Sequence, residues 1–406
     1  MPGIVNMDRV ILHCDMNSFF ASVELLEHPE LRDVPVAVSG SPDSRHGIIL
    51  AKNEAAKKYG VVTAETIWQA LKKCPDLSFL PPHHEKYREF SHKINKIYLE
   101  YTDMVEPFSV DESWLDVTAS QKLFGSGREI ADKIRNRVRE ELGLTLSAGV
   151  SYNKIFAKMG SEYKKPDATT VISRENYREL LWSMPVGEMF FVGWATAEKL
   201  RAMNIDTIGA LAMADSMALE KLLGKQGPVL RAYARGEDES PVCLYDQRDK
   251  IKSVGNGFTF SRNLKGEDDI MTALVSLSDT VAGRLRKYQL KAYGVKVDIK
   301  DPSFKTISRQ KQLELPTNLA DEIRKNAMDI IRSSWRIQDP IRLLTVTAIN
   351  LVDETESEQL SFFTNIDGGR ERSESIERTM DAIRSKFGDS SISFGQIIGN
   401  DIGIDL

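Results

Sequence analysis

The stretch RVILHCDMNSFFASVELL (residues 9–26) joins two hydrophobic patterns around one carboxylate. Residues 9–15 form a short apolar run that ends in Asp15, a pattern typical of a buried strand that delivers an acidic side chain to an edge or cleft. Residues 19–26 then show helical spacing. We therefore expect a strand and then a helix, with Asp15 at the end of the strand.

A second acidic position lies in VEPFSVDESWLDV (residues 105–117), where alternating side chains and turn residues predict a hairpin that carries Asp111 and Glu112. Further patterns predict strands at 34–38, 47–52 and 146–150, and helices at 53–59, 85–104 and 128–142. Strands and helices mixed in this order indicate an α/β or α+β core, with a sheet packed against helices.

The composition and the hydrophobic pattern of the chain change after residue 166. Residues 175–235 read as helical with short glycine-containing turns, and residues 251–352 form a second mixed region. Residues 353–406 are polar, so we expect this tail to be only partly ordered, with a helix at 375–387.

The length and composition of the chain limit the number of domains and the class of protein. A chain of 406 residues with 41% hydrophobic content is too long to fold around a single hydrophobic core, since single cores stop growing near roughly 250 to 300 residues. There is no long apolar run and no signal-peptide pattern, so we expect a soluble, cytoplasmic protein. Three widely spaced cysteines argue against a zinc site or a disulfide framework.

The net charge of -5 conceals an uneven distribution. Residues 246–352 carry 19 basic against 13 acidic side chains, whereas residues 353–406 carry 5 against 12. A locally basic region suits phosphate contacts. An ordinary solvated surface explains so modest an excess equally well.

Asp15, Asp111 and Glu112 are the side chains with the clearest chemical implication. Carboxylates at strand ends are hard oxygen ligands suited to Mg²⁺. A pair of such ions can stabilise the attacking and leaving oxygens of an in-line phosphoryl transfer. The simpler alternative is a turn-capping aspartate and a solvated acidic pair, and it is the commoner explanation of any one of these residues alone.

Three long strings carry a resemblance that favours the first interpretation. HCDMNSFFASVE (13–24), FSVDESWLDVT (108–118) and SAGVSYNKIFAKMGSEYKKP (147–166) resemble, in order and spacing, the signature segments of the Y-family (translesion) DNA polymerases, nearest the bacterial DNA polymerase IV type. The resemblance extends over roughly residues 8–363.

The resemblance implies an α+β multidomain fold arranged like a right hand. Its parts would be a palm with an antiparallel sheet, small fingers, a helical thumb with a helix-hairpin-helix, and a C-terminal α/β little finger. The expected boundaries are 1–18 and 76–166 for the palm, 19–75 for the fingers, 167–240 for the thumb, 241–250 for a linker, 246–352 for the little finger and 353–406 for the acidic tail.

The resemblance also implies the site. Asp15 and Asp111 would ligate two Mg²⁺ ions, with Mn²⁺ as an alternative, while the Met16 carbonyl assists and Glu112 is the other active-site carboxylate. Asp116 is not usually a ligand in the family, and we interpret it as structural.

Phe20 corresponds to the family's steric gate, a ring that leaves no room for a ribose 2′-hydroxyl. The alternative role, an aromatic on the buried face of the helix, suits Phe19 better because consecutive helical residues point in different directions.

Lys57 and Lys165 match the family's triphosphate-contacting positions. Arginine is more usual where Lys57 stands, and Glu54 replaces a common aromatic, so the grip on the nucleotide is expected to be weaker or rearranged. Asn17 departs from a commoner aspartate that is not a principal ligand. Exposed helical lysines are the plain alternative for Lys57 and Lys165.

Contacts with DNA are expected in two further places. PVGEMFFVGWATAEKLRAMNIDTIGALA (185–212) is similar to the family's helix-hairpin-helix, which can present backbone N–H groups to phosphate, although core packing explains the pattern equally well. In the predicted little finger, basic side chains offer salt-sensitive, sequence-indifferent backbone contacts; they are Lys296, Lys300, Arg309 and Arg342.

QLSFF (359–363) resembles the short motif by which bacterial polymerases attach to the sliding clamp. Its anchors would be Gln359, Leu360, Phe362 and Phe363, in a polar segment suited to docking in a groove. Chance occurrence of five residues is the alternative.

The expected activity is addition of dNMP to a primer 3′ end on primer-template DNA, from dNTP, with low fidelity and bypass of damaged template bases in DNA repair. We expect a monomer without a membrane partner. Two rivals stay open: another two-metal enzyme such as a nuclease or nucleotidyl cyclase, and a non-catalytic DNA-binding or clamp-binding protein.

Overall fold

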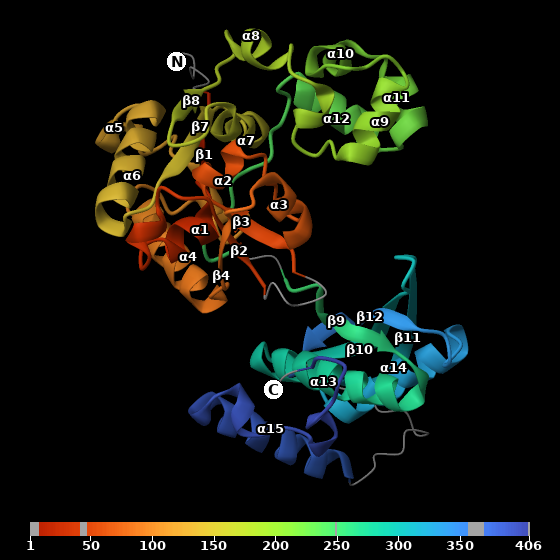
Figure 1. Ribbon diagram of the computed structural model, residues 1–406. Helices are drawn as coiled ribbons and strands as arrows, with labels where there is room; N and C mark the ends of the chain where they lie inside the picture. Colours follow the sequence, from red (N-terminus) through yellow and green to blue (C-terminus); the bar gives the residue numbers. More distant parts are fainter. Residues whose placement is uncertain (1–7, 41–46, 248–249, 356–368, 405–406) are drawn as a thin grey trace. The chain divides into compact units, whose positions relative to one another are not determined.

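The computed structural model describes residues 8–40, 47–247, 250–355 and 369–404, and these residues form two compact units. Unit 1 contains the described residues up to 247, and unit 2 contains those from 250 onward (Figure 1). Within the described ranges no helix combines the length and the apolar character that crossing a membrane requires.

Unit 1 is built around a five-stranded sheet with strand β1 (Ile11–Met16) at its centre. The strand order is β5-β6-β1-β7-β8, where β5 is Val105–Pro107, β6 is Glu112–Asp116, β7 is Leu146–Ser151 and β8 is Thr169–Val171. All neighbours are antiparallel except β7 and β8. The predicted strand and the predicted hairpin are therefore confirmed.

The two faces of β1 have different neighbours because successive side chains of a strand point to opposite sides. Leu12, Cys14 and Met16 join the apolar core that also contains residues of α4 (His84–Leu99) and α6 (Gly127–Leu142). The opposite face, which carries His13 and Asp15, lies against α7 (Lys154–Tyr163), as the contacts of these two residues show. The helix predicted at 128–142 is thus present as α6, the one predicted at 85–104 is present as α4 but ends at Leu99, and α7 covers the acidic face.

Gly149 in β7 allows α7 to lie this close to the sheet. A Cβ atom at that position would stand 1.9 Å from the backbone oxygen of Ala157, which no side chain can tolerate. The Asn153 side chain accepts a hydrogen bond from Phe156 N and so caps the first turn. The GVSYNK string therefore fixes both the start and the depth of α7.

A smaller three-stranded sheet, in the order β3-β2-β4, is the second sheet of unit 1. Its strands are β2 (Val36–Ser39), β3 (Ile49–Lys52) and β4 (Ser78–Leu80), and it is accompanied by α1 (Phe19–Glu24), α2 (Glu54–Lys58) and α3 (Ile67–Lys73). β4 belongs here because it pairs in parallel with β2, so this substructure extends past residue 75. In the same way β8 carries the five-stranded sheet past residue 166, because it pairs with β7.

The helical reading of residues 175–235 is confirmed, and these helices enclose their own apolar core. They are α8 (Tyr177–Leu181), α9 (Trp194–Arg201), α10 (Ile208–Met213), α11 (Ser216–Leu223) and α12 (Gln226–Ala234). A short helix, α5 (Gln121–Phe124), precedes α6 elsewhere in unit 1.

Unit 2 is a four-stranded antiparallel sheet in the order β11-β10-β12-β9, packed against two long helices (Figure 1). Its elements are β9 (Ser253–Leu264), α13 (Gly266–Lys287), β10 (Leu290–Lys300), β11 (Thr306–Thr317), α14 (Ala320–Ser334) and β12 (Ile341–Asp353). This mixed architecture agrees with the expected second α/β region.

The expectation of a partly ordered tail is wrong for residues 369–404. Helix α15 (Gly369–Phe387) is longer than the predicted 375–387, and Ile397, Ile402 and Ile404 are buried in the core of unit 2. The buried guanidinium of Arg286 pairs with Glu377 and Asp381 of α15. The acidic composition of the tail suggested a solvated segment. Two of its acidic side chains are instead the counterions of a buried arginine.

Candidate active site

A cavity of about 300 Å³ in unit 1 lies at the end of β1. Every residue predicted from the sequence for metal, sugar or triphosphate lines it, namely Asp15, Met16, Phe20, Lys57, Asp111, Glu112 and Lys165. These residues come from positions up to 150 residues apart in the chain. The fold therefore brings the whole predicted set together in one place.

The carboxylates meet because of strand register. Asp15 and Glu112 are directly opposite each other in the antiparallel pair of β1 and β6, and such cross-strand neighbours share one face of a sheet. Asp111 precedes β6, and its backbone oxygen accepts a hydrogen bond of 3.0 Å from Met16 N. The Asp111 carboxylate accepts from Ser109 Oγ at 2.5 Å.

Two lysines of the segment 154–165 neutralise this acidic cluster. Lys158 Nζ lies 2.7 Å from Glu112 Oε2 and 3.3 Å from Asp15 Oδ2. Lys165 Nζ lies 2.9 Å from Asp15 Oδ2, and both ammonium groups also contact Glu162. Lys165 was predicted from the sequence and Lys158 was not, although a charged residue within the largely buried helix α7 is a usable signal.

The ionisation of the cluster reflects burial and paired charge. Burial raises the pKa of Asp15 to about 7, against the opposing effect of Lys165 and Lys158. Burial also opposes ionisation of Glu112, but contacts with His13 and Lys158 outweigh it and lower the pKa to about 2. Carboxylates held in this way need cations beside them, and the two ammonium groups supply that positive charge.

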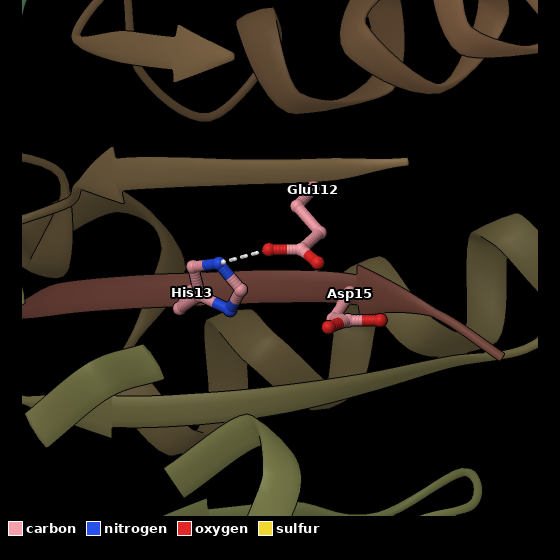
Figure 2. A group of neighbouring side chains, drawn as sticks. All are labelled: His13, Asp15 and Glu112. Carbon is pink, nitrogen blue, oxygen red and sulfur yellow. Dashed lines mark ion pairs between the residues drawn. The ribbon is translucent and has the colours of Figure 1, made fainter. Parts of the chain in front are cut away.

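His13 is the second residue that the sequence analysis missed. Its Nε2 atom lies 3.3 Å from Glu112 Oε2, and its Nδ1 atom lies 2.8 Å from Ser161 Oγ. Figure 2 shows His13 and Asp15 on one strand with Glu112 on the strand beside it. Ligand atoms of these three residues lie within 4.8 Å of one another. Burial lowers the pKa of His13 to about 4, so the ring is neutral at physiological pH.

This donor set fits a divalent ion of the hard, oxygen-preferring kind. Asp15 and Glu112 present carboxylate oxygens within one small group, and Asp111 lines the same cavity. The closely placed ammonium groups of Lys158 and Lys165 show that the site accommodates positive charge.

Phe19 and Phe20 have different surroundings although they are adjacent. Both line the cavity, but Phe19 is 3% exposed and belongs to the core, whereas Phe20 is half-buried. The Phe20 ring stacks on Tyr87 with ring centroids 4.0 Å apart and an angle of 12° between planes. The ring is thus held firmly at the cavity wall, and its role as a gate stays a prediction.

Lys57 is engaged by Glu54, whose Oε1 lies 2.5 Å from Lys57 Nζ. Lys52, which the sequence analysis did not single out, also lines the cavity and donates to Thr63 Oγ1 at 2.9 Å. Burial, and then the nearby Lys57, lower the pKa of Lys52. The replacement of an aromatic by Glu54 therefore gives Lys57 a fixed counterion at the cavity edge.

The predicted DNA contacts of unit 2 lie on its sheet. Lys296 and Lys300 are on β10, Arg309 is on the neighbouring β11, and Arg342 of β12 stacks over Phe304 at 4.7 Å. In unit 1, Gly193 precedes α9 as its N-cap. The proposed clamp motif at 359–363 lies outside the described residues.

This chain is similar to known proteins over most of its length. A model of the impB/mucB/samB family matches residues 14–162, and a model of that family's C-terminal domain matches residues 251–362. The chain is 46% identical over 392 residues to the DNA polymerase IV of Acetivibrio thermocellus, an alignment that covers 97% of this chain and 98% of that protein. It is 37% identical over 399 residues to the DNA polymerase IV 1 of Bacillus subtilis, covering 97% of this chain and 94% of the relative.

Among solved structures, the Y-family DNA polymerase chimera Dbh-Dpo4(243-245)-Dbh superposes with a TM-score of 0.76 at 23% identity. The superposition covers 85% of this chain and 99% of the chimera. At this level of identity the similarity establishes the fold, and it agrees with the expected α+β multidomain architecture.

Proposed function

Because this chain belongs to the impB/mucB/samB family and is a DNA-directed DNA polymerase of the Y-family DNA polymerase IV type, we propose that the cavity at the end of β1 is its polymerase centre. The observation that carries the proposal is the convergence of all seven predicted residues on that cavity. The rival of a non-catalytic accessory protein is disfavoured because the three carboxylates are present and meet.

In this proposal Asp15, Asp111 and Glu112 hold two Mg²⁺ ions, with the Met16 carbonyl as a further ligand. When bound, such ions stabilise the charge that develops on the attacking 3′-oxygen and the leaving pyrophosphate. Lys158 and Lys165 offset the repulsion between Asp15 and Glu112.

The lysines at the cavity wall would receive the triphosphate. Lys165 exchanges its contacts with Asp15 and Glu162 for contacts with phosphate oxygens. Lys57 likewise exchanges its contact with Glu54 for a phosphate oxygen. Each lysine acts as a point charge without a bidentate fork, so we expect a looser grip on the nucleotide than an arginine would give.

We also propose names for the substructures. The five-stranded sheet with α4, α6 and α7 is the palm, the three-stranded sheet with α1 to α3 the fingers, the helices from α8 to α12 the thumb, and the sheet of unit 2 with α13 and α14 the little finger. The fingers are small, and we infer that they leave room for damaged template bases.

Primer extension tests the proposal directly. We expect the full chain to extend a primer on a template with dNTP and Mg²⁺, to extend much less with rNTP, and to stop in EDTA. A second template with an abasic site should be copied past the lesion. Metal-dependent cleavage of DNA, or consumption of a nucleotide without primer and template, would instead identify the rival two-metal enzyme. Stalling at the lesion during normal copying elsewhere would contradict bypass.

We propose further that residues 359–363 bind the bacterial sliding clamp. The support is the sequence QLSFF, which directly follows the little finger, between β12, which ends at Asp353, and α15, which begins at Gly369. Replacing Phe362 and Phe363 by alanine should remove the stimulation of DNA synthesis by the clamp while leaving synthesis without clamp unchanged. Processivity with and without clamp measures this, and Ser361→Ala is the matched control. Full stimulation of the double variant would contradict the assignment.

A further inference from the structure

His13 occupies an unusual place for a histidine. Its side chain is fully buried on the α7 face of β1, with the ring 5.2 Å from that of Trp114 in an edge-on arrangement. The Nε2 atom is buried without a hydrogen bond of good geometry, and the Glu112 carboxylate lies beside it at 3.3 Å. A buried polar atom is costly unless it gains a partner, so simple core packing does not account for an imidazole here.

The partner of the other ring nitrogen is a hydroxyl, which is compatible with either tautomer. His13 Nδ1 lies 2.8 Å from Ser161 Oγ, and that hydroxyl can also turn to the backbone oxygen of Lys158 at 2.8 Å. A lone pair of Nε2 facing a carboxylate would be repulsive. The favourable arrangement has Nδ1 accepting from the Ser161 hydroxyl and Nε2–H donating towards Glu112.

The contacts of Glu112 fall on one oxygen. Both His13 Nε2 and Lys158 Nζ approach Oε2, at 3.3 Å and 2.7 Å. An acidic side chain gripped at one oxygen retains its second oxygen, Oε1, for another ligand. We propose that His13 is a positioning residue that holds Oε2 of Glu112 and so directs Oε1 to the metal; this inference rests on the proposed role of Glu112 as an active-site carboxylate.

The geometry disfavours the alternative in which His13 is itself a metal ligand. The Lys158 ammonium stands between Asp15 and Glu112, in contact with both. Mg²⁺ prefers oxygen ligands and an octahedral shell. An imidazole N–H that orients a ligating carboxylate needs no displacement of Lys158, and hydrogen bonds of this kind often tighten only when the substrate complex forms.

Two substitutions of His13 distinguish the role of Nε2 from that of Nδ1. The amide nitrogen of His13→Gln can reach the position of Nε2 and restore a donor to Glu112. That of His13→Asn is shorter and replaces Nδ1, beside Ser161, without reaching Glu112. The two variants differ by one methylene group. Each of them keeps a polar side chain on the face of β1 that lies against α7.

The experiment uses the full chain bound to a dideoxy-terminated primer-template with the matching dNTP, and it counts bound Mn²⁺ by electron paramagnetic resonance. We expect His13→Asn to weaken Mn²⁺ binding about 10-fold or more, the usual effect of losing a partner of a metal ligand. His13→Gln should stay close to wild type. DNA affinity and the unfolding temperature of His13→Gln and His13→Asn should match, and the loss in single-turnover extension should be recovered partly by added metal.

The outcomes are distinguishable. If wild type fails to extend primers or needs no metal, the proposed function is wrong. If wild type is active but His13→Asn binds Mn²⁺ as wild type does, or His13→Gln loses as much as His13→Asn, the positioning role is overturned. Nitrogen hyperfine coupling to Mn²⁺ in wild type would overturn it too, since it would make His13 a ligand. Should both His13 variants unfold, Ser161→Ala decides: we expect weaker Mn²⁺ binding, and unchanged binding overturns the role.

Discussion

The Asp111→Asn variant is expected to lose nearly all primer extension while it binds primer-template DNA as wild type does. Asparagine keeps the shape of the side chain and an oxygen that can accept from Ser109 Oγ. The hydrogen bond from Met16 N to the backbone oxygen of residue 111 is also retained. What is removed is the negative charge that a divalent cation needs.

Metal stabilisation of transferring phosphate is worth several kcal/mol, so we expect the rate of extension to fall by at least ~10³-fold. Single-turnover extension measures the rate, and fluorescence anisotropy of labelled DNA measures binding over a salt series. The matched control is Asp116→Asn, at the far end of β6, where the carboxylate accepts a hydrogen bond from Thr118 N at 2.9 Å and stabilises a turn.

The control should extend primers close to the wild-type rate. Retained extension by Asp111→Asn would remove Asp111 from the catalytic centre. An equal loss in both variants would point to a disturbed strand β6 and would leave the assignment of Asp111 without support from this test.

Local elements of unit 1 could be predicted from the sequence, whereas their pairing could not. The apolar run before Asp15 and the alternation around Glu112 each predict a strand. The register that sets Asp15 opposite Glu112 joins residues about 100 positions apart, and no local pattern specifies it. From the sequence, only the resemblance of the three segments to one family indicated that Asp15 and Glu112 belong to the same site.

Two of the residues that could not be assigned from the sequence share one cause. His13 and Lys158 stand inside the quoted strings but within apolar segments, so each reads as an exception in a buried element. Their meaning depends on α7 lying against β1, which Gly149 permits by lacking a Cβ atom. The acidic tail was misjudged for a related reason, because Glu377 is a partner of buried Arg286 and not a solvated charge.

The Phe20→Ala variant is expected to admit ribonucleotides. The Phe20 ring lines the cavity and is fixed by a parallel stack on Tyr87 and an edge contact with His84, whose ring centroid is 5.8 Å away. A ring so supported cannot move aside cheaply, because both neighbours would have to repack. An extra hydroxyl group forced against it costs about 1–3 kcal/mol, as in other overpacked sites. Removing the ring should therefore raise rNTP use relative to dNTP about 10- to 100-fold.

Single-turnover kcat/KM for dCTP and rCTP on the same primer-template measures the effect. Phe20→Tyr is the matched control, because it keeps the ring and its stack on Tyr87 and should keep discrimination. The neighbouring Phe19 supplies a second comparison: it is buried in the core, so Phe19→Leu should alter stability more than sugar choice. If Phe20→Ala still extends with dCTP but rejects rCTP as wild type does, the ring of Phe20 does not contact the sugar, and another wall of the cavity must exclude the 2′-hydroxyl.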